Sequence, residues 1–151
     1  MALDIGIDLG TANIIITIAG KGIVLNEPSV VAYDKKKKAV VAVGAEAYKM
    51  IGRTPEYIVA VRPLKDGVIS DNDMTEAMIR EFIHMVNSGA MMKPRIVLCV
   101  PSSVTDVERR AVVEAAMSAG ARKVFLIEEP IAALIGAGVD ISKPNGTMVV
   151  D

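Results

Sequence analysis

A short polar turn near the amino terminus has the residue types that can hold a phosphate group. This polar turn is residues 8–13, and it contains Gly10, Thr11, Ala12 and Asn13. Glycine lets the backbone approach an anion with no Cβ atom in between, so that successive N–H groups can point at it. The hydroxyl of Thr11 and the carboxamide of Asn13 add neutral donors. The turn therefore predicts a phosphate site, and a plain β-hairpin turn is the alternative.

Acidic residues follow the apolar runs that are expected to form strands. Asp8 ends the first run, Glu128 and Glu129 end a later one just before Pro130, and Asp151 follows the last. Carboxylates at the carboxyl ends of neighbouring strands meet at one edge of an α/β sheet. Asp8 is an oxygen ligand that can hold Mg²⁺ through water, and a carboxylate can also orient water for attack. The pattern predicts a metal–nucleotide site, although the two glutamates also suit the positive end of a helix dipole.

The elements that must position these residues predict an α/β fold. Three short strands form an antiparallel meander, and three later strands alternate with helices, which indicates a parallel sheet with right-handed crossovers. The six predicted strands are residues 5–9, 14–18, 23–25, 95–100, 124–127 and 148–150. The third is expected to break at residues 26–28, where Pro28 lies.

Two capping boxes predict the starts of helices. One is residues 73–76, and the other is residues 105–108, whose helix is expected to run to Gly120. In the first helix, apolar residues recur at helical spacing and should pack on the sheet. These residues are Met78, Ile79, Phe82, Met85 and Val86. His84 falls on the face opposite Phe82, and we expect it to be exposed, without a catalytic role.

A small subdomain is predicted to be inserted into the main one. It contains a strand pair, a lysine-rich turn between the strands and a short helix closed by Gly52. The insertion is residues 30–70, the main subdomain is residues 1–29 and 71–151, the strand pair is 29–33 and 39–43, and the helix is 45–51. Lysines 35–38 predict a solvated hairpin tip, with a membrane-surface patch as the alternative.

Composition excludes several functions. The net charge is −1 and aromatic residues make up 3% of the chain, so a nucleic-acid partner is not expected. The single cysteine, Cys99, lies in an apolar run and is predicted to be a small buried hydrophobic residue. Neither a P-loop nor a dinucleotide-binding glycine motif is present. Without a signal-like segment or a long apolar run, the chain is expected in the cytoplasm.

Six blocks in order along the chain resemble the bacterial actin family of MreB and its close paralogues, including Mbl. They are DLGTAN (8–13), KGIVLNEPSVV (21–31), RPLKDGVI (62–69), VPS (100–102), VERRA (107–111) and IEEP (127–130). The resemblance implies the actin-like, ribonuclease H-type fold with an inserted small subdomain. It also implies ATP with Mg²⁺, self-association into filaments at the inner face of the cell membrane, and cooperation with the cell-wall elongation machinery.

The resemblance also implies roles for individual residues. The polar turn, with Gly10, Thr11, Ala12 and Asn13, is similar to the first phosphate loop of the family. Glu129 matches the residue that orients the hydrolytic water, with Glu128 as a less favoured neighbour, and Asp151 matches the acid that opens the second phosphate loop. Asp8 and Asp151 are thus expected near the metal through water. The chain departs from the family at Ile14, where threonine is usual, and at Ile15, where eukaryotic actin has a phosphate-binding lysine.

Two further expectations come from the resemblance. Met91 and Met92 match a hydrophobic loop that family members insert into the membrane. Without the resemblance, these two apolar residues would be expected to pack against their own domain. The family also continues beyond Asp151 with a second half that clamps the nucleotide, so these residues alone should bind ATP weakly or not at all, hydrolyse none, and self-associate through uncovered apolar surface. A phosphotransferase of the same superfold, such as a sugar or acetate kinase, and a chaperone-type ATPase are the rival functions.

Overall fold

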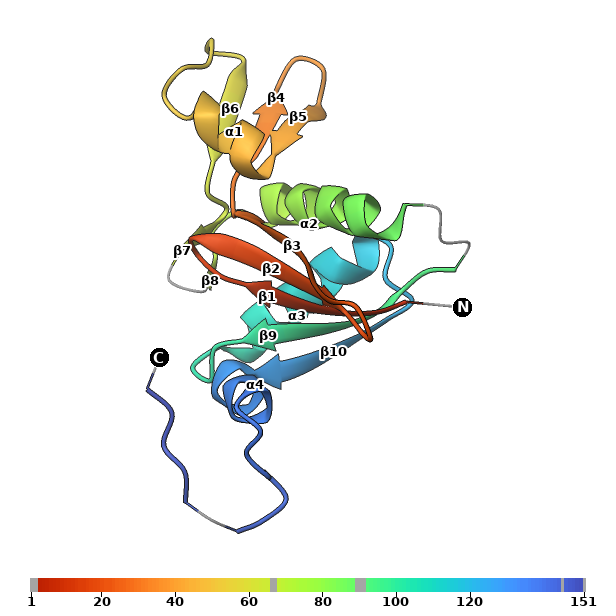
Figure 1. Ribbon diagram of the computed structural model, residues 1–151. Helices are drawn as coiled ribbons and strands as arrows, with labels where there is room; N and C mark the ends of the chain where they lie inside the picture. The colour runs from red at the N-terminus through yellow and green to blue at the C-terminus, as the bar shows by residue number, and fades with distance from the viewer. Residues whose placement is uncertain (1–2, 66–67, 89–91, 145, 151) are drawn as a thin grey trace.

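A five-stranded mixed sheet forms the centre of the molecule (Figure 1). The computed structural model describes residues 3–65, 68–88, 92–144 and 146–150. The sheet has the order β10-β9-β1-β2-β3. Its strands are β1 (Asp4–Leu9), β2 (Asn13–Ile18), β3 (Gly22–Pro28), β9 (Arg95–Val100) and β10 (Lys123–Glu128). β1, β2 and β3 pair antiparallel, while β1, β9 and β10 pair in parallel, as the sequence predicts.

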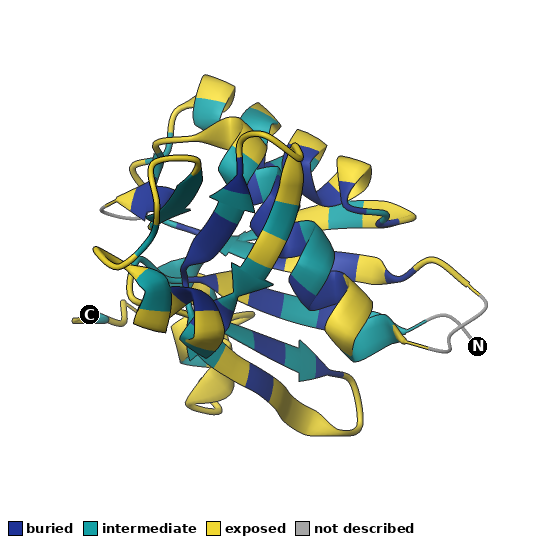
Figure 2. Cartoon of the chain, turned by 90° about the horizontal axis from the view of Figure 1, so that it is seen from above, coloured by how far each residue is buried: buried dark blue, intermediate teal, exposed yellow. Residues whose placement is uncertain are grey.

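One face of this sheet forms the core. Buried residues alternate with more exposed ones along β1, β2 and β9 (Figure 2), because successive side chains of a strand point to opposite faces. The buried strand residues share a core with helices α2 (Asn72–Asn87) and α3 (Asp106–Ser118). This layer fixes the sheet, so the ends of its strands have defined positions.

The two helices confirm one capping box and correct the other. In α3, the Thr105 hydroxyl accepts from the backbone N–H of Glu108 and the Glu108 carboxylate accepts from that of Thr105. In α2, the cap is Asp71, whose carboxylate accepts from the N–H of Met74 at 3.0 Å. The predicted start at residues 73–76 was wrong, because the N-cap is Asp71, two residues earlier than Asp73.

Burial along α2 follows most of the predicted stripe. Phe82 is fully buried and His84 is exposed, as expected. Met85 is 55% exposed, so its predicted place in the core was wrong, and Ile83 is buried instead. At about 100° per residue, the packed face of α2 is centred near Ile79 and Phe82, so that Ile83 lies at one edge of it and Met85 beyond the other.

Residues 31–61 form a second sheet that lies at one end of the molecule with helix α1 (Figure 1). Its order is β5-β4-β6, with β4 (Val31–Asp34), β5 (Ala39–Val43), β6 (Ile58–Val61) and α1 (Gly44–Met50). The Asp34 carboxylate accepts from the N–H groups of Lys36 and Lys37, which shapes the β4–β5 turn. All four lysines of this turn are exposed, as predicted for a solvated tip. A small hairpin, β7 (Leu64–Lys65) and β8 (Val68–Ile69), leads back to α2.

Two strand predictions need correction. β3 continues to Pro28, because it is an edge strand and the missing N–H of proline need not face a partner there. Residues 148–150, predicted as a strand, have no ladder partner in the described part of the chain, and Met148 and Val150 are 84% and 88% exposed. They follow α4 (Glu129–Gly136) as an extended segment.

None of the described helices is both long and apolar enough to cross a bilayer.

Candidate functional site

A cavity of about 950 Å³ lies at the carboxyl ends of the parallel strands. Residues from β1 and the polar turn, from the end of β9 and from the start of α4 line it, together with the extended segment after α4. Those from the first three segments are Asp8, Leu9, Gly10, Thr11, Cys99, Pro101, Ser102, Glu129, Pro130, Ala132 and Ala133. This is the edge at which the sequence predicts a ligand.

The register of the parallel strands explains why these residues meet. Asp8 on β1 is the partner of Cys99 on β9, and Cys99 is the partner of Ile127 on β10. Asp8 is exposed because it alternates with the buried residues Ile7 and Leu9. The cavity therefore lies beside the sheet face opposite the core, where the chain turns from each strand into its loop.

Cys99 lines this cavity and is not a core residue. Its side chain is half-buried, so the predicted buried position was wrong. Burial raises the pKa of the Cys99 thiol to about 11, and the negative charges of Asp8 and Glu129 add to the effect. The thiol is therefore neutral near pH 7 and contributes a small, weakly polar surface.

The polar turn has a close backbone approach at Gly10. A Cβ atom at this position would lie 2.5 Å from the carbonyl oxygen of Asn13, which no side chain tolerates. Gly10 and Thr11 line the cavity, whereas Ala12 and Asn13 are exposed outside its lining. The Asn13 carboxamide donates to Asn26 Oδ1 at 2.9 Å and so joins β2 to β3. The structure therefore brings half of the predicted phosphate-binding residues to the cavity wall.

Two residues outside the predicted site donate hydrogen bonds to backbone carbonyl groups of the polar turn. Ser29 Oγ donates to the carbonyl oxygen of Gly10 at 2.6 Å, and Arg62 Nη1 donates to that of Ala12 at 3.0 Å. Ser29 is fully buried although it is polar, which is the type of signal that marks a required hydrogen bond. That signal appears only in the folded chain, because the two residues are far from the turn in sequence.

The two glutamates before Pro130 have different surroundings. Glu129 lines the cavity from the first turn of α4. Glu128 caps that helix at the end of β10 and forms an ion pair with Arg109 of α3, at 3.4 Å between Arg109 Nη2 and Glu128 Oε1. Because Glu128 is paired with Arg109 and does not line the cavity, Glu129 is the better candidate for a residue that acts there.

Other predicted site residues lie partly outside the described chain. Asp151, the second predicted metal residue, and Met91, the first residue of the membrane loop, are outside it, while Met92 is described and is 45% exposed. Among the described residues, no three His, Cys, Asp or Glu side chains gather closely enough to hold a metal ion directly. Binding of Mg²⁺ through water to Asp8 stays a prediction.

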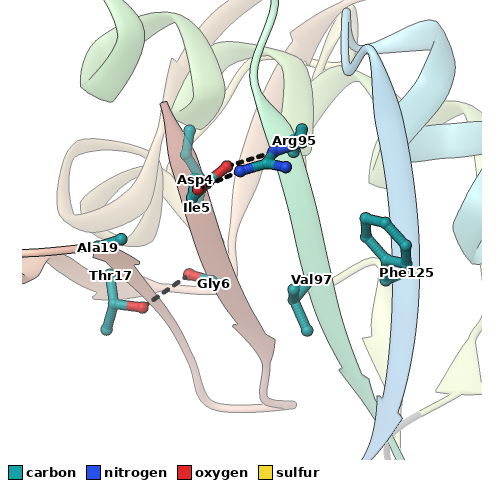
Figure 3. Close-up of a pocket in the computed structure, with 8 residues that line it drawn as sticks. All are labelled: Asp4, Ile5, Gly6, Thr17, Ala19, Arg95, Val97 and Phe125. Carbon is teal, nitrogen blue, oxygen red and sulfur yellow. Dashed lines mark hydrogen bonds and ion pairs between the residues drawn. The ribbon is translucent and has the colours of Figure 1, made fainter. Parts of the chain in front are cut away.

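A second cavity, of about 380 Å³, lies on the open face of the sheet and contains none of the predicted site residues (Figure 3). Val97 and Phe125 lie beside each other there and are 40% and 44% exposed. At its rim, Arg95 Nε donates to Asp4 Oδ1 at 2.6 Å, and this hydrogen bond lowers the pKa of the Asp4 carboxyl. The lining is largely apolar and lacks groups that would recognise phosphate, so the first cavity is the candidate site.

Comparison with known families agrees with this arrangement. The family model described as MreB/Mbl protein matches residues 2–151. The chain belongs to the MreB/Mbl family. It is 58% identical to the cell shape-determining protein Mbl of Bacillus subtilis (strain 168), over 99% of this chain and 45% of that protein. It is 56% identical to the cell shape-determining protein MreB of Escherichia coli (strain K12), over 98% of this chain and 44% of that protein.

Solved structures confirm the predicted actin-like α/β fold of this MreB/Mbl family member. The crystal structure of MreB5 of Spiroplasma citri bound to ADP superposes with a TM-score of 0.81 at 38% identity, covering 95% of this chain and 43% of that one. The MamK double helical filament shares the fold with a TM-score of 0.77 at 21% identity, covering 91% and 44%. The chain thus spans less than half the length of the relatives it matches.

Proposed function

We propose that this chain forms the phosphate-binding part of a nucleotide-switched cytoskeletal subunit that determines cell shape. In such a subunit, ATP bound at this cavity would favour filament formation, and hydrolysis near Glu129 would weaken the filament. The relatives named as cell shape-determining proteins support this proposal. The ADP and AMPPNP bound to MreB5 of Spiroplasma citri support a nucleotide as the ligand.

The observation that carries the proposal is the shared cavity of the polar turn, Asp8 and Glu129. The turn requires glycine at position 10, because a Cβ atom there would lie 2.5 Å from the carbonyl oxygen of Asn13, and Gly10 also lines the cavity, where no Cβ atom separates its backbone from a ligand. The backbone and the Thr11 hydroxyl supply hydrogen-bond donors, and the two carboxylates supply oxygen acceptors. Donors beside acids suit a metal–phosphate ligand better than a bare anion, which two carboxylates would repel.

Each residue would then have a separate role in the cavity. The N–H groups of the turn bind phosphate oxygens, and Asp8 holds the hydration shell of a magnesium ion, with Asp151 as the second such residue. Bound Mg²⁺ neutralises phosphate charge. Glu129 accepts a hydrogen bond from water and orients it toward the terminal phosphate. With isoleucine at positions 14 and 15, no lysine is supplied at this point of the turn.

A calorimetric titration tests the nucleotide proposal. The longest natural form of the protein should bind Mg-ATP. The 151-residue chain should bind it far more weakly, because these residues would supply only part of the contacts to the nucleotide. Electron microscopy with ATP should then show filaments. Absence of Mg-ATP binding by the longest form would overturn the proposal. Turnover by a monomer that depends on an added phosphate acceptor would favour the phosphotransferase alternative.

We further propose that the protein works at the inner face of the cell membrane, with the loop at Met91 and Met92 as a contact and the wall-elongation machinery as a partner. Met92 exposes 45% of its surface next to Lys93, a combination that suits an anionic lipid surface. Co-sedimentation with anionic liposomes should fall when Met91→Ser and Met92→Ser are combined. Met117→Ser is the control, because Met117 is 44% exposed on α3. Equal binding by the two variants would contradict membrane contact through this loop.

A further inference from the structure

Arg62 donates hydrogen bonds to two consecutive carbonyl groups of the polar turn. Its Nη1 donates to the carbonyl oxygen of Ala12 at 3.0 Å and to that of Thr11 at 3.3 Å. The residue follows β6, the last strand of the small sheet, and its guanidinium carbon lies 5.4 Å from the centre of the Tyr48 ring of α1. A cation over an aromatic ring at this distance is attracted to it, so Tyr48 helps to fix the arginine side chain.

Ser29 completes the set of contacts to the turn. The Ser29 hydroxyl donates to the carbonyl oxygen of Gly10 at 2.6 Å, and its backbone N–H donates to that of Ala12 at 2.9 Å. The carbonyl groups of Gly10, Thr11 and Ala12 are therefore all held by donors that come from the end of β3 and the end of β6. Three carbonyls in a row that are all bound in this way leave the turn little freedom.

The planarity of the peptide bond converts these contacts into an orientation of donors. In a trans peptide, the C=O of one residue and the N–H of the next point in opposite directions. Fixing the carbonyls of residues 10, 11 and 12 therefore fixes the N–H groups of residues 11, 12 and 13, and of these three residues Thr11 lines the cavity. Successive N–H groups form an anion-binding concavity when their directions agree. Fixing them before binding removes part of the ordering cost of the ligand.

We propose that Arg62 is a positioning residue that, with Ser29, presents the N–H groups of the polar turn to the phosphates of a nucleotide. This inference rests on the proposed nucleotide function and adds a residue to it. Arg62 acts through the turn, so its removal weakens the grip on the terminal phosphates and leaves the rest of the nucleotide contacts in place. Arg62 also connects the small sheet to the polar turn, because it directly follows β6 and its side chain bonds to the carbonyl oxygen of Ala12.

The test compares nucleotides that differ in their phosphate tails, using the longest natural form of the protein and competition against a fluorescent nucleotide. Arg62→Ala should weaken Mg-ATP about tenfold and AMP by less than about twofold, because only the tail reaches the turn. Arg62→Lys should recover part of the ATP affinity, since an ammonium group can still donate to a carbonyl. Arg53→Ala is the matched control, because Arg53 is an exposed arginine that lies just after α1.

Two results would overturn the proposal: unchanged ATP affinity in Arg62→Ala, or an equal loss for ATP and AMP together with a lowered melting temperature. A second measurement does not depend on nucleotide binding. Amide hydrogen exchange at Thr11, Ala12 and Asn13 should be faster in Arg62→Ala than in Arg53→Ala, and equal exchange would also overturn the proposal. If the wild-type protein bound no nucleotide while this exchange still changed, the proposed function would fail and the positioning of the turn would stand.

Discussion

Cys99 lies directly beside Asp8 in the parallel pairing of β9 with β1, and both side chains line the cavity at the carboxyl ends of the strands. A thiol in this position has a carboxylate as its neighbour and is partly removed from water. Burial therefore raises the pKa of Cys99 to about 11, with Asp8 and then Glu129 as further causes. Because it is the only cysteine in the sequence, its titration can be followed without interference.

Alkylation of Cys99 should be slow at neutral pH. The thiolate is the reactive form, so its rate with iodoacetamide should keep rising between pH 8 and pH 10, where an ordinary thiol levels off. The pKa of Cys99 is higher in the folded protein than in the unfolded chain. The thiol therefore contributes fully to stability below its ordinary pKa, and this contribution is lost as the pH rises toward 11. A native rate at pH 8 equal to that in urea would contradict the raised pKa.

Replacement of Gly10 by alanine should disrupt the polar turn. The added Cβ atom would lie 2.5 Å from the backbone oxygen of Asn13, which cannot move without shifting the hairpin. We expect a loss of about 1–3 kcal/mol in the free energy of unfolding, as for other overpacked sites, and a loss of Mg-ATP binding. Gly136→Ala is the control, because a Cβ atom there meets nothing within 4 Å. Urea titration measures both variants, and equal stabilities would show that the turn adapts.

Loss of the Glu27 carboxylate should destabilise the start of α1. Glu27 Oε2 accepts from the N–H of Ala45 at 2.8 Å, whereas the N-cap residue, Val43, provides no side-chain hydrogen bond. Glu27→Ala should lower the free energy of unfolding by about 1 kcal/mol, the usual cost of a lost helix cap. Glu46→Ala is the comparison, because its ion pair with Lys49 is exposed and should be worth less than about 0.5 kcal/mol. The order of the two melting temperatures checks this prediction.

Substitutions of the two adjacent glutamates should have different effects on the rate of ATP hydrolysis. Glu129→Gln should reduce ATP turnover by the longest natural form of the protein about a hundredfold or more, because it removes the carboxylate proposed to orient water. Glu128→Gln should reduce turnover by less than about tenfold, since Glu128 bonds to Arg109 and lies outside the cavity lining. Mg-ATP affinity should change little in either variant. A larger loss in Glu128→Gln would reverse the assignment.

Local sequence signals predicted most of the elements and part of the site. The capping box at Thr105 was right because its donors and acceptors lie within three residues of one another. The start of α2 was missed because Asp71 and Asp73 both have the short carboxylate that suits an N-cap, and only the folded chain shows that Asp71 is the one that bonds to the first turn. Residues 148–150 have a strand-like sequence but no ladder partner in the described chain, and a strand needs one.

The sequence by itself determined the alternation that builds the sheet, the glycine at the close approach of the turn, and the family to which the chain belongs. Those properties depend on residue type and near neighbours. Only the tertiary structure decided that Cys99 lies beside Asp8. It also decided that Glu129 lines the cavity while Glu128 pairs with Arg109. The hydrogen bonds from Ser29 and Arg62 to the polar turn likewise appear only in the folded chain. These pairings join residues 17 to 91 positions apart in the sequence. Register and packing select them, and neither is encoded in any short segment.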